Sequence, residues 1–122
     1  MIHLLEKEAK KASSTELYRS QIYRLKQALR TTTETGVLHF QLGQLYFETA
    51  DLTQAEYHFR HALIAVEQHP EAHAGLAALY KQWGKHQLAT YHFEKACALE
   101  PGWRTDILIH FFESPQAKRN GR

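Results

Sequence analysis

The sequence predicts an all-α fold made of short repeated helices, within one domain that spans residues 1–122. Three observations support this prediction. The chain holds only 3 Pro and 6 Gly, and Ala, Leu, Gln, Glu and Lys fill long stretches, a composition that favours helix. A segment of 34 residues occurs twice in succession, and within each copy apolar residues recur at every third or fourth position. That spacing places them on one face of a helix.

The repeat is visible when residues 36–69 are aligned with residues 70–103. Nine of the 34 aligned positions are identical, whereas unrelated segments of average composition would share about two. The identical pairs are His39/His73, Leu42/Leu76, Leu45/Leu79, Tyr46/Tyr80, Ala55/Ala89, Tyr57/Tyr91, His58/His92, Phe59/Phe93 and Ala62/Ala96. Residues 36–69 are therefore repeat one, and residues 70–103 are repeat two.

Each repeat is predicted to contain two helices joined by a tight turn. In repeat one the first apolar stripe ends at Tyr46 and the second begins at Ala55, so the turn falls at residues 49–51. The matching turn of repeat two falls at residues 83–85, where Gly84 suits the end of a helix. Two helices joined this tightly must pack antiparallel.

The pattern resembles the tetratricopeptide (TPR) family, in which a large residue is followed by Leu-Gly, Tyr, Ala, Phe, Ala and a closing Pro. The matching positions are His39, Leu42, Gly43, Tyr46, Ala55, Phe59 and Ala62 in repeat one, and His73, Leu76, Ala77, Tyr80, Gly84, Ala89, Phe93, Ala96 and Pro101 in repeat two. The sequence departs from the family in having His for Trp at both first positions, Ala77 for Gly, and Glu67 for the closing Pro. The resemblance implies a right-handed stack of helices, but it does not identify the partner.

The segments that flank the repeats are predicted to complete the stack, because two repeats alone leave apolar faces uncovered. Residues 1–35 look like a degenerate helical pair, with one helix over residues 2–12 and another over residues 16–30. Glu8 and Ala12 occupy positions that the family fills with Leu and Tyr, so we expect the first of these helices to be loosely held. Residues 104–114 are predicted to form a capping helix, and residues 115–122 a disordered basic tail.

The resemblance also implies where a partner would bind, on the concave side formed by the first helix of each repeat. The corresponding positions are Val37, Phe40, Gln44, Phe47 and Glu48 in repeat one, Glu71, Ala74, Ala78, Lys81 and Gln82 in repeat two, and Leu108 and Phe112 in the capping helix. Phe40, Phe47, Leu108 and Phe112 are predicted to be spare, that is, not needed for the packing of the repeat itself. Ala74 and Ala78 would leave a trough for an apolar helix or an extended peptide. The alternative is that the N-terminal segment or the tail folds back over this trough, and Trp103 is a candidate for its rim.

The nine histidines invite a metal site, and His58, His61 and His92 are the candidates by spacing. A zinc site needs three or four converging ligands, and no carboxylate or cysteine is arranged around these residues. We therefore expect no metal and no cofactor. His39 and His73 are better explained as core histidines, and a separate hypothesis is that His58 and His92 sense mild acid.

Nucleic-acid binding and catalysis also have little support. The net charge is +2, and a mildly acidic middle lies between basic ends. The basic residues of the first segment are interleaved with Glu and are Lys7, Lys10, Lys11, Arg19, Arg24, Lys26 and Arg30. No phosphate-binding glycine loop, nucleophile motif or paired carboxylates are placed by spacing, so we do not expect an enzyme.

The predicted function is therefore a non-catalytic protein–protein interaction module, an adaptor or assembly factor that binds an apolar helix or peptide of a partner protein. The alternative is a self-associating TPR protein, a homodimer that buries its Phe-rich face. No stretch of the sequence is apolar enough for a membrane span. The order of charges at the start is unlike a secretory signal, and a single cysteine, Cys97, is compatible with a reducing compartment, so we expect a cytoplasmic protein.

Overall fold

The computed structural model confirms the all-α prediction. It describes the backbone of residues 2–103 and the side chains of residues 14–103, and in this part of the chain it contains helices and no strand. The helices are α1 (Ile2–Leu29), α2 (Thr35–Glu48), α3 (Leu52–Ala65), α4 (Pro70–Gln82) and α5 (His86–Leu99). The predicted capping helix and basic tail, together with Leu108 and Phe112, lie outside the described residues.

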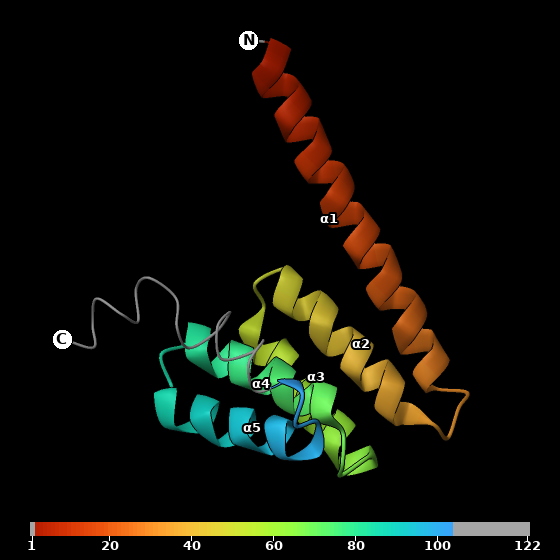
Figure 1. Cartoon of the computed structure of the whole chain (residues 1–122). Coiled ribbons are helices and arrows are strands. Elements are labelled where there is room, and N and C mark those ends of the chain that lie inside the picture. Colours follow the sequence, from red (N-terminus) through yellow and green to blue (C-terminus); the bar gives the residue numbers. More distant parts are fainter. Residues whose placement is uncertain (1, 104–122) are drawn as a thin grey trace, which may run out of the picture.

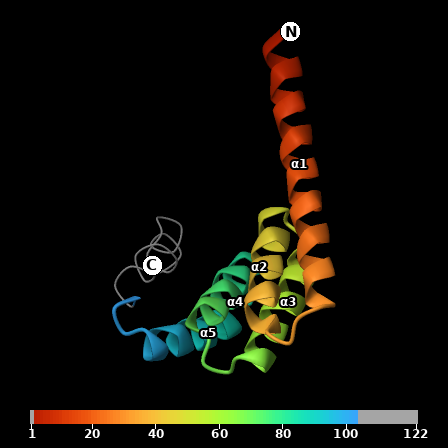
Figure 2. The same ribbon diagram turned by 90° about the vertical axis from the view of Figure 1, so that its right-hand side faces the viewer.

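The helices stack in chain order. The α2/α3 and α4/α5 pairs form two antiparallel hairpins, α3 packs against α4, and α1 packs against α2 (Figure 1). A view at right angles shows the same order, with α1 at one side of the stack and α5 at the other (Figure 2). α2 also contacts α4, so the first helices of the two repeats lie side by side. No helix within residues 2–103 combines the length and the apolar character that crossing a membrane requires.

Both predicted turns are confirmed, and they have the same hydrogen-bond pattern. Asp51 N–H donates to the Tyr46 carbonyl at 2.9 Å, and Lys85 N–H donates to the Tyr80 carbonyl at 2.8 Å. This bond closes a Schellman motif, which needs one residue in the left-handed region. That residue is Gly84 in repeat two, with φ of 80°, and Ala50 in repeat one, with φ of 65°. Only Ala50 bears a Cβ in this conformation, which has a steric cost.

Phe59 of α3 is the centre of the core between the repeats. Its side chain is 2% exposed and is enclosed by Leu76 and Leu79 of α4, which are 0% exposed. A Cβ added to Gly43 on α2 would lie 2.6 Å from the Phe59 ring, and one added to Gly75 on α4 would lie 2.7 Å from it. The ring is therefore held between two helix surfaces that carry no side chain at the point of contact.

The N-terminal segment differs from the prediction. Two helices were expected, over residues 2–12 and 16–30, but α1 is one continuous helix from Ile2 to Leu29. Residues 15–17, which occupy the repeat positions of the two turns, include neither Gly nor Pro, and Glu16 matches Ala50 and Gly84. Continuing the helix through Glu16 avoids the cost of a left-handed conformation at a residue with a long side chain.

Candidate partner-binding groove

A groove of about 320 Å³ lies between the first helices of the two repeats. We call it the α2–α4 groove, and its lining residues are Phe40, Gln44, Phe47, Glu48, Phe59, Glu71, Ala74, Gly75, Ala78 and Trp103. It exists because Ala74, Gly75 and Ala78 leave one flank of α4 almost without side chains, whereas the facing flank of α2 carries two aromatic rings.

The groove brings together most of the residues that the sequence assigned to the ligand-facing side. Of the ten such residues within the described part, seven line it, and Val37, Lys81 and Gln82 do not. Val37 is 61% exposed near the start of α2. Trp103 lines the groove as expected of a rim residue, whereas Phe59 and Gly75 were missed. Gly75 follows Ala74 in a run of small residues, a signal that was present in the sequence.

The prediction that Phe40 and Phe47 are spare is wrong. Both are half-buried and pack against the core that contains Phe59. The Phe40 ring centroid lies 5.9 Å from that of Phe59 and 5.2 Å from that of His69. The sequence pattern gave no sign of this, because the contact depends on how α2 crosses the helices beside it. These two rings therefore have a packing role and also form one wall of the groove.

The charged side chains that line the groove are acidic. Glu48 ends α2 and Glu71 is in the first turn of α4, and both are exposed. Glu48 accepts a hydrogen bond of 3.2 Å from the hydroxyl of Tyr18, which raises the pKa of that phenol. No lysine or arginine among the described residues lines this groove, so its potential is negative at its edges.

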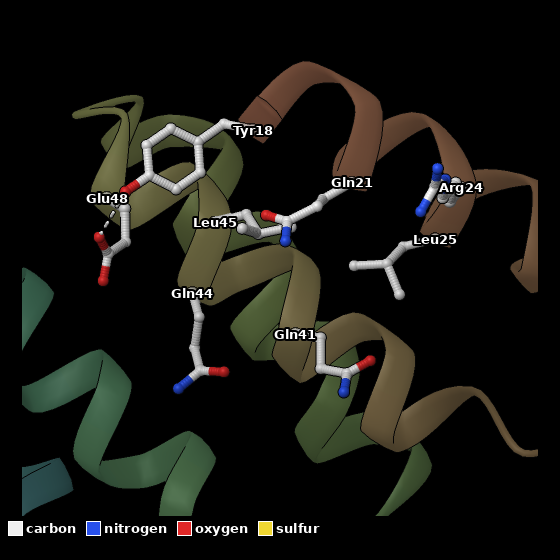
Figure 3. Close-up of a pocket in the computed structure, with 8 residues that line it drawn as sticks. All are labelled: Tyr18, Gln21, Arg24, Leu25, Gln41, Gln44, Leu45 and Glu48. Carbon is white, nitrogen blue, oxygen red and sulfur yellow. Dashed lines mark hydrogen bonds between the residues drawn. The ribbon is translucent and has the colours of Figure 1, made fainter. Parts of the chain in front are cut away.

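A second groove, of about 510 Å³, lies on the other side of Gln44 and Glu48, between α1 and α2. We call it the α1–α2 groove. Figure 3 shows Tyr18 bonded to Glu48 at one end and Arg24 at the other, with Leu25 and Leu45 between the two helices. Its lining residues are Tyr18, Gln21, Arg24, Leu25, Gln41, Gln44, Leu45 and Glu48. Nothing in the sequence analysis singled out this site.

The histidines of the two repeats form matching pairs. His39 Nδ1 lies 3.0 Å from His58 Nδ1, and His73 Nδ1 lies 3.0 Å from His92 Nδ1. In each pair one nitrogen must donate a proton and the other must accept it, so the accepting ring must be neutral and the two rings cannot both be protonated. His73 is buried, as expected of a core histidine, whereas His39 is only half-buried.

Burial lowers the pKa of all four paired histidines. It lowers the pKa of His58 to about 4, with smaller contributions from His39, Lys26 and His61. It lowers the pKa of His92 to about 4 as well, where His73 and Arg60 add to the effect. For His39 and His73 the pKa is also lowered, again mainly by burial. The pairs are thus neutral at neutral pH and resist protonation.

A metal centre finds no geometric basis in the part of the chain whose side chains are described. No three His, Cys, Asp or Glu side chains there are grouped so that they could hold an ion. His58 and His61 share a face of α3, but their neighbours do not add a further metal ligand. His61 packs against the rings of His39 and Tyr57, and His39 Nδ1 is hydrogen-bonded to His58 Nδ1. Cys97, the other soft donor, is buried on α5 in contact with the core residues Ala77 and Phe93.

Comparison with models of protein families gives no match for this chain. Comparison with curated protein sequences gives none either.

Proposed function

We propose that the chain is a TPR-type protein-binding module, an adaptor or assembly factor that holds an apolar helix or peptide of a partner protein in the α2–α4 groove. The observation that carries the proposal is that most of the positions expected to face a ligand line a single groove. The TPR resemblance selected ten described residues as ligand-facing, and seven of them line one groove in the folded chain.

The shape of the groove suits an amphipathic segment. Phe40 and Phe47 supply one apolar wall, and Ala74, Gly75 and Ala78 form a floor that a partner backbone can approach closely. Grooves of this kind take apolar side chains at helical spacing, or alternate side chains of an extended peptide. The two half-buried rings are already fixed by the core, so little side-chain entropy is lost when they receive a ligand.

The acidic residues of the groove indicate the charge of the expected partner segment. Glu48 and Glu71 line the groove and are exposed residues. The Glu48 carboxylate also accepts a hydrogen bond from Tyr18, and Glu71 Oε2 lies 3.2 Å from His69 Nδ1. A segment with apolar residues on one side and Lys or Arg beside them complements this arrangement, whereas an acidic segment is repelled. We therefore expect a basic amphipathic partner segment.

The test is a selection of displayed short peptides on the full chain, followed by affinity measurements on the enriched sequences. Enriched peptides should combine apolar residues at helical or alternating spacing with Lys or Arg. Ala78→Phe fills the groove without removing a core side chain, and it should weaken binding about tenfold or more. Ile64→Ser paired with Leu88→Ser is the matched control, because both residues are exposed and lie outside the groove. This control should bind as the wild type does.

Charge reversal separates the electrostatic contribution from the apolar one. Glu48→Lys combined with Glu71→Lys should reduce affinity for basic peptides and shift the selection toward acidic ones.

Binding that is equal in the wild type and in Ala78→Phe would contradict the groove assignment. A wild-type chain that enriches no peptide but forms a dimer lost in Ala78→Phe would favour the alternative, self-association through this face.

A further inference from the structure

α1 has the length and register of a complete repeat. Moving the bounds of α2 and α3 back by the repeat length of 34 gives residues 1–14 and 18–31, and α1 spans residues 2–29. The residues between these halves, 15–17, correspond to the turns at 49–51 and 83–85, but in α1 they are helical. α1 is therefore a repeat whose two helices continue in one line instead of folding into a hairpin.

Only the second half of this helix packs against the body. The hydrogen bond between Tyr18 and Glu48 joins the last turn of α2 to the middle of α1. With 28 residues against 14, α1 is about 42 Å long and α2 about 21 Å. Figures 1 and 2 show the first half of α1 running beyond the end of α2 with no other described helix beside it.

The α1–α2 groove is the place that a first helix would fill. In repeat order Leu25 corresponds to Phe59 and Leu45 to Leu79, which are 2% and 0% exposed in the complete repeats. In the groove both leucines are only half-buried. The apolar side chains are thus present, but no described helix occupies the place that α2 takes beside Phe59 in repeat one.

We propose that residues 2–14 of a second copy of the chain fill this groove, so that two copies exchange their first helices. A helix of this length is marginal in water unless it packs on something. While α1 is continuous, its first half points away from its own groove, but a second copy placed antiparallel presents an equivalent groove to it. The two α1 helices then lie side by side about a two-fold axis near residues 15–17, and each copy completes the other.

Charge complementarity supports a second copy as the occupant. Glu8 corresponds in repeat order to Leu42, and Arg24 corresponds to His58. In repeat one the His58 ring contacts the rings of His39 and Tyr46, which lie three positions before and four after residue 42 on α2. By the same register residue 24 of one copy lies against positions 5 and 12 of the other, and position 8 lies between these two on the same helix face. An acidic residue on the exchanged helix thus meets a basic residue of the groove, in positions where complete repeats carry Leu and His.

The experiment is a charge-exchange assay on the full chain, with molar mass measured by light scattering or sedimentation across a range of concentrations. The wild type should dimerise. Glu8→Arg and Arg24→Glu should each raise the dimer dissociation constant about tenfold or more, because each places like charges together at both exchanged helices. An equimolar mixture of the two variants should recover the wild-type dissociation constant, since both new pairs are then opposite in charge. Arg19→Glu is the matched control, an equal charge change at an exposed α1 residue outside the groove.

Three results would overturn the proposal. One is a wild type that stays monomeric at all concentrations, while each single variant lowers the free energy of unfolding and the double variant restores it. That result would mean that residues 2–14 fold back onto the groove of their own copy. The second is a monomer whose stability none of these changes affects. The third is a dimer that neither variant weakens. The inference does not depend on the peptide-binding proposal, because Ala78→Phe alters only the α2–α4 groove and should leave this dimer intact.

Discussion

His39 and His58 face each other through their Nδ1 atoms at 3.0 Å, and one repeat later His73 and His92 make the same contact at the same distance. Each pair joins the two helices of one repeat, and each is stacked against a tyrosine of the first helix, Tyr46 or Tyr80. A neutral ring that donates to another neutral ring suits this partly buried site. Protonation of the accepting ring would remove the acceptor and place a charge where it is poorly hydrated.

The histidine pairs predict acid sensitivity. The pKa of His58 and of His92 is about 4 in the folded chain, against about 6.5 when unfolded. The unfolded state therefore binds more protons between these values, so the free energy of unfolding should be constant above pH 6.5 and should decrease as the pH falls toward 4. We expect a loss on the order of 3 kcal/mol per pair at the acid limit, measured by urea unfolding at several pH values.

The control for this prediction removes one pair at a time. Replacing His39 and His58 together by Phe removes both hydrogen-bonding rings and keeps two aromatic side chains, so about half of the pH dependence should disappear. His86→Asn changes an exposed histidine and should leave the profile unchanged. A wild-type stability that is flat between pH 8 and pH 5 would refute the role of the pairs.

The two left-handed turn positions predict opposite effects of exchanging Gly and Ala. Ala50→Gly should stabilise the chain by about 0.5–1 kcal/mol, because relief of the left-handed strain exceeds the added flexibility of the unfolded chain. Gly84→Ala should destabilise it by a similar amount, since φ there is 80°. Thermal unfolding of the two variants checks both signs, and equal signs would contradict the strain argument.

The glycines around Phe59 predict a cost for an added methyl group. Gly43→Ala and Gly75→Ala place a Cβ within 2.6 and 2.7 Å of a buried ring, so overpacking of about 1–3 kcal/mol should outweigh the gain in helix propensity. Gly102→Ala, with no atom within 4 Å of its Cβ, is the control. In a Phe59→Leu background the cost of Gly75→Ala should shrink, and an additive double-mutant cycle would contradict the proposed contact.

The hydrogen bond of the buried Tyr80 predicts that its loss lowers the stability of the chain more than the same change at Tyr46 of repeat one. Tyr80 donates a 2.6 Å hydrogen bond to Glu56 of α3, and burial followed by this bond raises its pKa. Tyr80→Phe should therefore destabilise the chain by about 1–2 kcal/mol in urea unfolding, because Glu56 loses a partner in a half-buried site. Tyr46→Phe, at the same repeat position next to His58, should cost less. Equal costs would mean that the bond to Glu56 adds nothing.

The sequence by itself determined the two repeats, their turns and most of the α2–α4 groove. The repeats and turns follow from periodicity along the chain: apolar spacing defines each helix, and Ala50 and Gly84 lie where the turns close. The groove residues follow from the resemblance of this repeat to the TPR pattern. These signals are local, so they can be read before the helices are assembled. Ala74 and Ala78 were chosen as groove residues because they match the ligand-facing positions that the TPR resemblance implies.

The tertiary structure alone decided the rest, because it depends on how helices cross. The angle between α2 and its neighbours brings His39 onto His58 and turns Phe40 toward the core, and no spacing along one helix specifies either contact. The continuity of α1 has the same origin. Residues 2–14 carry enough helix propensity for either arrangement, and a hairpin forms only where packing across it outweighs the strain of the turn at Glu16.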